Sequence, residues 1–136
     1  MCGMNAVRSP MAEALAREIL PSSTFLASAG VHAGERDPFV DVVLAEAGLT
    51  LGPRPPRTLD DLEDDYFDLI VTLAPEAHHA ALELTRSMAV DVEYWPTADP
   101  TLARGTREQI LAAYRDVRER LKARIQALGK RGNDRD

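Results

Sequence analysis

The sequence contains a single cysteine and no long hydrophobic run. Because Cys2 is the only cysteine in 136 residues, an intramolecular disulfide and every zinc site built from several thiolates are excluded. No apolar run approaches the ~18 residues of a membrane-spanning helix. The start of the sequence has neither a basic region nor an apolar core, so no signal peptide is predicted. These absences indicate a cytoplasmic protein with no membrane partner and no metal.

The charge balance excludes a further class of protein. The 16 basic and 22 acidic residues give a net charge of −6, which argues against nonspecific nucleic-acid binding. The hydrophobic share of 45% and the charged share of 28% are ordinary for a folded chain. We therefore expect one domain over residues 1–128 and a flexible polar tail over residues 129–136.

Proline-containing starts predict the first two helices. Ser9 can cap a helix whose first position is Pro10, and the apolar face that follows comprises Met11, Leu15 and Ile19. Asp37 and Pro38 repeat the same device, and that helix is expected to end at Gly48.

Strands and helices alternate in the predicted order. Apolar runs predict strands over residues 24–28, 67–73 and 90–94, with a helix over 75–86 between the last two. Thr106 and Gln109 have the spacing of a capping box and open a last helix. The expected buried stripe of that helix comprises Ile110, Tyr114, Val117, Leu121 and Ile125. This alternation indicates a parallel sheet in an open α/β fold.

In such a sheet, ligands bind beyond the carboxyl ends of the strands. Two segments with chemically capable residues fall at such ends: residues 2–9, before the first helix, and the segment that contains Asp99, after the strand at 90–94.

Residues 2–9 have the features of an oxyanion cradle around a nucleophile. Backbone N–H groups, a helix N-terminus and Arg8 would all surround Cys2, and all three favour thiolate over thiol. The guanidinium of Arg8 matches two phosphate oxygens. Ser9 can donate a hydrogen bond to the sulfur, and Asn5 tolerates the backbone of a tightly curled loop. A cysteine and an arginine at this spacing also occur by chance.

Asp99 supplies an acid at the same sheet edge. Cleavage of a phosphate ester by a thiolate expels an oxygen leaving group, which departs more easily when it is protonated. Asp99 can give that proton and later take one from water. The alternative is that Asp99 and Pro100 only initiate a turn, as Asp37 and Pro38 also can.

Other polar groups are interpreted without a catalytic role. His78 and His79 are expected to form a solvated surface pair, and His32 to lie in a plain loop. The acidic run over residues 60–65 is typical of a solvated short helix rather than of a metal site.

The sequence resembles the low-molecular-weight protein tyrosine phosphatases over nearly its whole length. Residues 2–13 (CGMNAVRSPMAE) resemble the signature loop of that family. The further collinear matches are the Ser-Ala-Gly turn at 28–30, the second-helix pattern over 34–48, the third strand at 68–71 and the acid loop over 94–100.

The resemblance implies an open three-layer sandwich, with a four-stranded parallel sheet flanked by helices. It also implies a hydrolase without a cofactor that acts on phosphotyrosine proteins or small aryl phosphates. Cys2 would be the nucleophile that forms a phosphocysteine, Arg8 the phosphate clamp and Asp99 the general acid and then base. The residues that would bind phosphate are Gly3, Met4, Asn5, Ala6, Val7, Arg8 and Ser9, and those that would support the loop are Asn5, Ser9 and Ser28.

The sequence departs from the family pattern in several places. Met4 replaces a common glycine, and Val7 replaces a second cysteine that could protect the nucleophile as a disulfide. The aromatic residues that often follow the acid are replaced by Thr101, Leu102 and Ala103. Only Met1 precedes Cys2, so the first strand is expected to be missing, and we hypothesise that a longer product carries it.

Two alternative functions remain open. The first is an arsenate reductase coupled to an external thiol, because a relay through further cysteines is excluded by the single Cys2. The second is a catalytically inactive relative that only binds oxyanions; the joint presence of Cys2, Arg8, Ser9 and Asp99 argues against it.

Overall fold

Strands and helices alternate along the chain, as the sequence predicts. The computed structural model describes residues 2–4, 8–21, 26, 28, 30–32, 37–50, 68–86 and 90–134, with the backbone alone at 2–4, 31, 32, 84 and 131–134. In chain order the elements are β1 (Cys2–Met4), α1 (Arg8–Ile19), β2 (Gly30–His32), α2 (Pro38–Glu46), β3 (Leu69–Thr72), α3 (Pro75–Leu84), β4 (Asp91–Tyr94), the 3-10 helix η2 (Pro100–Leu102) and α4 (Arg107–Asp134).

The chain divides into two compact units. The first holds the described strands and α3, and it comprises Met1–Pro10, Ser28–Arg36 and Arg54–Ala98. The second holds α2, η2, α4 and the part of α1 after Pro10, and it comprises Met11–Ala27, Asp37–Pro53 and Asp99–Asp136. Because one boundary falls between Ala98 and Asp99, the acid predicted from the sequence belongs to the second unit.

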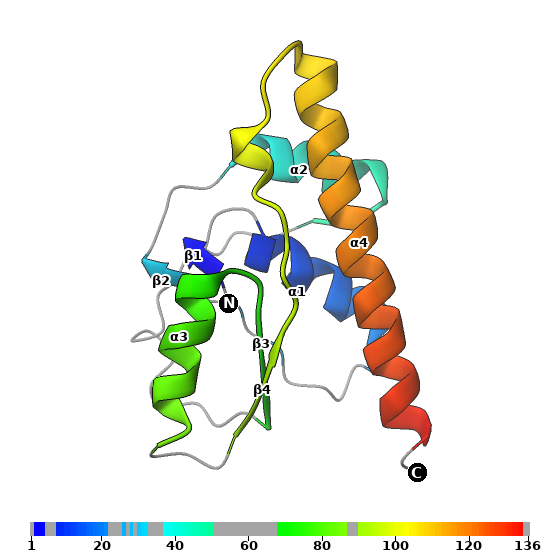
Figure 1. Cartoon of the computed structure of the whole chain (residues 1–136). Helices are drawn as coiled ribbons and strands as arrows, with labels where there is room; N and C mark the ends of the chain where they lie inside the picture. Colours follow the sequence, from blue (N-terminus) through cyan, green and yellow to red (C-terminus); the bar gives the residue numbers. More distant parts are fainter. Residues whose placement is uncertain are drawn as a thin grey trace. The chain divides into compact units, whose positions relative to one another are not determined.

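The strands form two parallel pairs. β1 pairs with β2, with Cys2 opposite Gly30, and β3 pairs with β4, with Thr72 opposite Tyr94 (Figure 1). Parallel strands connected through helices confirm the predicted α/β class. Within the described residues the hydrogen-bonded ladders join the strands only in these pairs, so the predicted four-stranded sheet is not observed as one ladder.

A short strand begins at the cysteine itself. The strand expected to be missing would precede Cys2 and end there, whereas β1 has three residues and begins at Cys2. β1 forms a parallel ladder with β2, a pairing that the sequence did not predict. The strand before Cys2 and the longer product that would carry it stay predictions.

The second strand also lies at a different place. The apolar run predicted it at residues 24–28, but β2 spans Gly30–His32. Leu26 and Ser28 belong to no strand, and residues 24, 25 and 27 lie outside the described residues. Pairing with β1 explains the difference, because strand formation depends on a partner more than on local residue type.

Helix α3 contacts all the described strands of the first unit. It begins at Pro75, as predicted, and ends at Leu84, where the sequence predicted residue 86. Ala77 and Ala81 lie on one side of the helix and are fully buried. Small side chains at this spacing let a helix backbone approach its neighbours closely. Further buried side chains lie at the end of β3 and just after β4. They are Thr72, Leu73, Ala74 and Trp95.

The ends of α1 and α2 show how well capping residues predict helix boundaries. α1 begins at Arg8, so Ser9 lies inside its first turn and does not cap it, contrary to the prediction. For α2 the prediction is confirmed: Asp37 Oδ1 accepts a hydrogen bond from the backbone N–H of Phe39 at 2.9 Å. The helix ends before Gly48, whose φ of 76° lies in the left-handed region that glycine adopts at little cost.

Helix α4 begins with the predicted capping box. The N–H of Thr106 donates to Gln109 Oε1 at 2.8 Å, and the N–H of Gln109 donates back to Thr106 Oγ1 at 3.2 Å. Ile110 was expected to head the buried stripe, but it is half-buried, whereas Leu111 is buried. Regular helix continues to Asp134, past the expected end near residue 129. The buried stripe comprises Leu111, Tyr114, Val117, Leu121 and Ile125.

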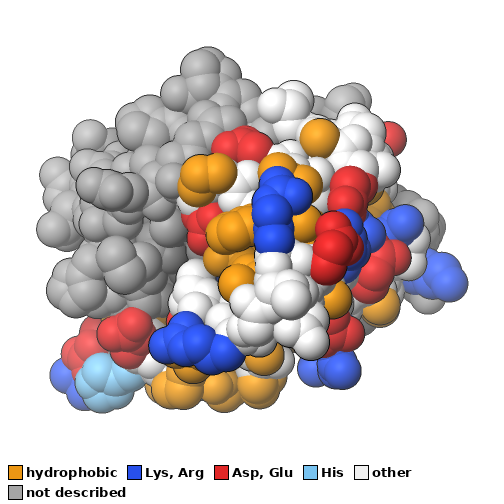
Figure 2. Space-filling view, turned by 90° about the horizontal axis from the view of Figure 1, so that it is seen from above, with side chains coloured by type: hydrophobic (Ala, Val, Ile, Leu, Met, Phe, Trp, Pro, Cys, Tyr) orange, Lys and Arg blue, Asp and Glu red, His pale blue; other side chains and the backbone are white. Residues whose placement is uncertain are grey.

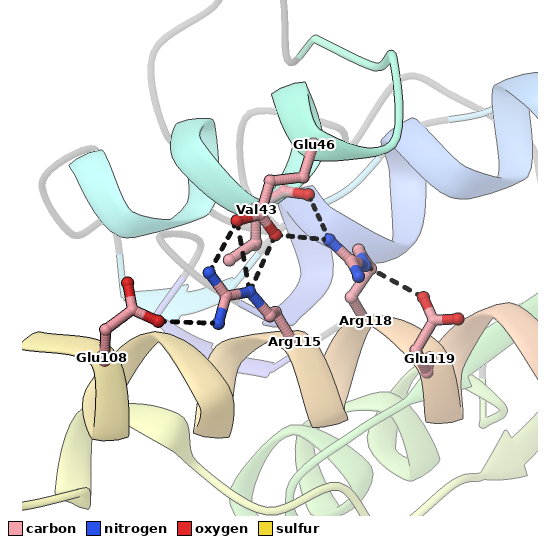
Figure 3. Close-up of polar contacts among 6 residues, drawn as sticks. All are labelled: Val43, Glu46, Glu108, Arg115, Arg118 and Glu119. Carbon is pink, nitrogen blue, oxygen red and sulfur yellow. Dashed lines mark hydrogen bonds and ion pairs between the residues drawn. The ribbon is translucent and has the colours of Figure 1, made fainter.

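An ion-pair network joins α2 to α4 within the second unit (Figure 3). Arg115 donates to both carboxylate oxygens of Glu46, at 2.9 Å from Nε and 2.7 Å from Nη2. Arg118 donates to Glu46 Oε1 at 3.0 Å and to the carbonyl of Val43 at 2.6 Å. The Arg115 hydrogen bonds, followed by that from Arg118, lower the pKa of Glu46 from 4.5 to about 2 although partial burial opposes the change.

This network makes a stability prediction with a definite sign. Because the pKa of Glu46 is lower in the folded chain than in the unfolded one, its stabilisation is fully present above the unfolded value of 4.5 and is lost as the pH falls toward about 2. The thermal midpoint of Glu46→Gln should therefore lie below that of the parent at pH 7, and the gap should shrink as the pH is lowered.

Glu83→Gln is the matched control for this measurement. Its ion pair with Arg86 is mostly exposed, with side-chain exposures of 51% and 78%, and exposed pairs contribute little to stability. The control should follow the parent at every pH. A gap for Glu46→Gln that stays constant from pH 7 to pH 3 would contradict the role given to the network.

Charged side chains of both signs lie on part of the described surface, beside hydrophobic ones (Figure 2). On the face shown in Figure 2, acidic and basic side chains lie next to one another. Within the described residues no helix is both long enough and apolar enough to cross a membrane.

Candidate functional site

The predicted anion-binding stretch connects β1 to α1. Cys2 is the first residue of β1, and Arg8 is the first residue of α1. The first turn of α1 has no acidic residue. The first backbone N–H groups of a helix lack intrahelical partners, so this terminus favours an anion. The predicted phosphate-binding residues outside the described part are Asn5, Ala6 and Val7, together with the side chains of Cys2 and Met4. The backbone of Gly3 is described as part of β1.

Arg8 makes a long-range contact inside the first unit. Its Nη1 donates a hydrogen bond to the backbone carbonyl of Thr97 at 2.9 Å, between residues 89 positions apart in the sequence. The bond is partly buried, which strengthens its electrostatic part relative to an exposed one. It ties the start of α1 to the segment that follows β4, one of the two segments the sequence selected.

The segment after β4 is itself fixed to the end of β3. The N–H of Trp95 donates to the carbonyl of Thr72 at 2.8 Å, and the N–H of Thr97 donates to the carbonyl of Leu73 at 3.1 Å. The hydroxyl of Thr97 donates to the carbonyl of Trp95 at 2.8 Å. These bonds hold the Thr97 carbonyl in place as the acceptor for Arg8.

Asp99 lies in the second unit and is the N-cap residue of the 3-10 helix η2. Its Oδ1 accepts two hydrogen bonds from Thr101, one from the backbone N–H at 3.0 Å and one from the hydroxyl at 2.6 Å. The carboxylate is partly exposed. The turn that the sequence allowed as an alternative is therefore present, and a turn of this kind does not prevent the carboxyl group from acting as an acid.

A buried phenol lies near this carboxylate in the same unit. Tyr114 donates its hydroxyl to Asp37 Oδ2 at 2.7 Å. Burial raises the pKa of Tyr114 well above its usual range, and the bond to Asp37 and the negative charges of Asp37 and Asp99 raise it further. Tyr114 thus stays protonated and neutral beside two carboxylates.

The remaining candidates have mixed outcomes. Ser9 and Ser28 are buried, with 3% and 8% of their surface exposed. His79 is exposed as predicted, but His78 is half-buried. Its Nδ1 lies 3.0 Å from the Thr72 hydroxyl, and its ring stacks on Tyr94. The expectation of a solvated histidine pair was therefore wrong for one member, because the helix turns His78 toward β3 and β4.

Other sequence candidates lie outside the described residues. They are the acidic run over residues 60–65 and the side chain of His32. The backbone of His32 forms the end of β2, so the prediction that it lies in a loop was wrong, because it pairs with β1. Among the side chains that the structure does describe, no group of three or more His, Cys, Asp or Glu is placed to hold a metal ion.

Sequence reasoning missed two residues that contact the candidate side chains, one in each unit. Thr97 acts through its backbone carbonyl, which no side-chain motif reveals. Thr101 holds Asp99 through its hydroxyl. A signal for the second was present, since a threonine two positions after an aspartate has the spacing of a capping turn.

The chain matches a known protein family over almost its full length. The model of the family described as "Low molecular weight phosphotyrosine protein phosphatase" matches residues 1–134. A curated relative, the arsenate reductase of Bacillus subtilis (strain 168), is 30% identical over 135 residues, which is 97% of this chain and 94% of the relative.

Solved structures agree with this match. The crystal structure of an arsenate reductase from Archaeoglobus fulgidus is 33% identical, covers 95% of each chain and superposes with a TM-score of 0.72. The YwlE arginine phosphatase from Geobacillus stearothermophilus is 21% identical, covers 98% of this chain and 90% of its own, and gives a TM-score of 0.81. The second likeness concerns the fold alone.

Proposed function

Because the chain belongs to the low molecular weight phosphotyrosine protein phosphatase family, we propose that it is a phosphomonoesterase acting through a phosphocysteine. Its substrates would be phosphotyrosine in proteins or small aryl phosphates. The observation that carries the proposal is the 2.9 Å bond from Arg8 to the Thr97 carbonyl. It supports the proposal because it joins the helix start that follows the cysteine to the segment that leads along the chain to the acid.

In the first proposed step, the Cys2 thiolate attacks phosphorus and the ester P–O bond breaks. Asp99 gives its proton to the departing oxygen, so that a phenol leaves in place of a phenolate. Arg8 and the backbone N–H groups at the start of α1 stabilise the charge on the transferred phosphoryl oxygens. These donors match the equatorial oxygens of the transition state, where negative charge is spread.

In the second proposed step, water attacks phosphorus and the S–P bond breaks. The Asp99 carboxylate now takes a proton from the water, inorganic phosphate leaves and the thiolate is regenerated. The nucleophile, the acid and the cation are all side chains of this chain, so the proposed reaction needs no cofactor.

The proposed substrate range depends on the residues that follow Asp99 in the sequence. Residues 101–103 include no aromatic ring, and Leu102 is 70% exposed. A branched aliphatic side chain can contact an aryl group but does not stack on it as an aromatic ring would. We therefore propose small aryl phosphates as the better substrates, with phosphotyrosine proteins as the alternative.

Arsenate reduction is a second candidate because the curated relatives, including that of Bacillus subtilis, are arsenate reductases. Reducing arsenate to arsenite takes two electrons, which two thiols supply by forming a disulfide. The sequence has one cysteine, so the second thiol would come from an external low-molecular-weight thiol. Arsenite formation that depends on added glutathione would favour this candidate over the phosphatase.

Hydrolysis of p-nitrophenyl phosphate near pH 6 tests the proposal. The parent should turn over the substrate and be inhibited by vanadate, and Asp99→Ala should lower kcat by about 10²-fold because one general acid is lost. Asp116→Ala is the matched control, since Asp116 is an exposed aspartate whose contact is an i,i+4 pair with Arg120. The control should keep the parental rate.

The possible results separate the three candidate functions. Turnover that falls in Asp99→Ala and persists in Asp116→Ala supports the phosphatase. Absence of turnover together with thiol-dependent arsenite formation would replace it with the reductase. Tungstate binding without either activity would identify an oxyanion-binding protein.

A further inference from the structure

The Asp99 carboxylate is held asymmetrically. Both hydrogen bonds from Thr101, at 3.0 Å from the backbone N–H and at 2.6 Å from the hydroxyl, end on Oδ1. Among the described residues no donor hydrogen-bonds to Oδ2. Tyr114, the nearby phenol, donates its hydroxyl to Asp37 and not to Asp99.

This asymmetry decides which oxygen can carry a proton. A proton on Oδ1 would face the two hydrogens that Thr101 already directs at that atom. Oδ2 has no such conflict, so the neutral carboxyl carries its proton there while Oδ1 remains the acceptor. The 2.6 Å separation is typical of a strong hydroxyl-to-carboxylate bond, which also fixes the rotation of the carboxyl group.

We infer that Thr101 is a positioning residue for the acid: its hydroxyl holds Oδ1 and leaves Oδ2 to deliver the proton to the leaving oxygen. The inference rests on the proposed function, because it gives Asp99 its part as the acid. The backbone N–H of residue 101 forms the turn in any variant, whereas the hydroxyl is specific to threonine or serine.

A leaving-group comparison tests the inference with three variants. Thr101→Val keeps the shape and removes the hydroxyl, Thr101→Ser keeps the hydroxyl, and Thr85→Val is a control in which a hydroxyl bonded to a helix carbonyl is lost elsewhere. Each is assayed for kcat/KM with phenyl phosphate and with p-nitrophenyl phosphate. This parameter covers only the steps up to release of the phenol.

Thr101→Val should lower kcat/KM for phenyl phosphate about tenfold and that for p-nitrophenyl phosphate about twofold or less, because the poorer leaving group depends more strongly on proton delivery. Thr101→Ser should restore both values, and Thr85→Val should change neither. A role in folding alone would lower both substrates equally in Thr101→Val.

A double-mutant cycle gives the second test. In Asp99→Asn no proton can be delivered, so adding Thr101→Val should cause no further loss with phenyl phosphate. An additional tenfold loss, or equal losses for both substrates in Thr101→Val, would overturn the inference while an active parent upholds the proposed function. An inactive parent would overturn both.

Discussion

Replacing Cys2 with serine is expected to abolish turnover of p-nitrophenyl phosphate, with a fall of at least about 10³-fold in kcat. The proposed reaction passes through a covalent bond between phosphorus and the Cys2 sulfur, and the sequence offers no second cysteine to replace it. A serine hydroxyl is far less nucleophilic at neutral pH, because almost none of it is ionised. The measurement is the steady-state rate with and without vanadate.

Two controls separate lost chemistry from lost structure in Cys2→Ser. The variant should keep the far-ultraviolet circular dichroism and the thermal midpoint of the parent. It should also still bind tungstate, since Arg8 and the start of α1 are unchanged. A variant that retains a tenth or more of the parental rate would show that the sulfur is not the nucleophile.

Replacing Arg8 with lysine is expected to lower kcat/KM by about 10²–10³-fold, as loss of an oxyanion donor does. The guanidinium can donate to the Thr97 carbonyl through one nitrogen and to phosphate through others. A lysine ammonium has the same charge but is a single point donor at the end of a flexible stem. It cannot hold both partners in the same geometry.

Arg17→Lys is the matched control for this change. Arg17 lies on the same helix, and its pair with Glu13 is 3.2 Å long with 51% of the arginine side chain exposed. Such a pair contributes only a few tenths of a kcal/mol, so kcat/KM and stability should stay parental. An Arg8→Lys variant within about twofold of the parent would contradict the role of the guanidinium fork in phosphate binding.

Local chemistry allowed several elements of the fold to be predicted from the sequence. Asp37 before a proline and Thr106 three positions before Gln109 give helix starts whose hydrogen bonds the structure contains. The left-handed glycine at the end of α2 follows from the same short-range logic, because Gly48 has no side chain to clash. Each of these features depends on neighbours within a few residues.

The errors concern interactions between distant residues. β2 lies at Gly30–His32 because β1 pairs there, and no local pattern contains that information. Leu111 is buried and Ile110 only half-buried, although the helical spacing to Tyr114 favours burial of Ile110. The half-buried His78 depends likewise on Thr72 and Tyr94, which belong to other elements.

For the candidate site, the sequence indicated which residues take part, and the structure shows the groups that form hydrogen bonds with them. Arg8 and Asp99 were both selected by chemistry, but the carbonyl that holds one and the hydroxyl that holds the other were not. Backbone carbonyls are present at every position, so their use is decided only by the fold. The Thr101 hydroxyl is relevant because it lies beside Asp99. A motif that contains the aspartate alone does not include residue 101.

Trapping the phosphorylated intermediate would show whether the Cys2 sulfur is the nucleophile. The parent would be mixed with p-nitrophenyl phosphate, quenched in acid within the first turnover and digested for peptide mass spectrometry. We predict one added phosphoryl group on the peptide that contains Cys2, and none in Cys2→Ser treated in the same way. Turnover by the parent with no phosphoryl group on Cys2, or with one on another residue, would contradict the account.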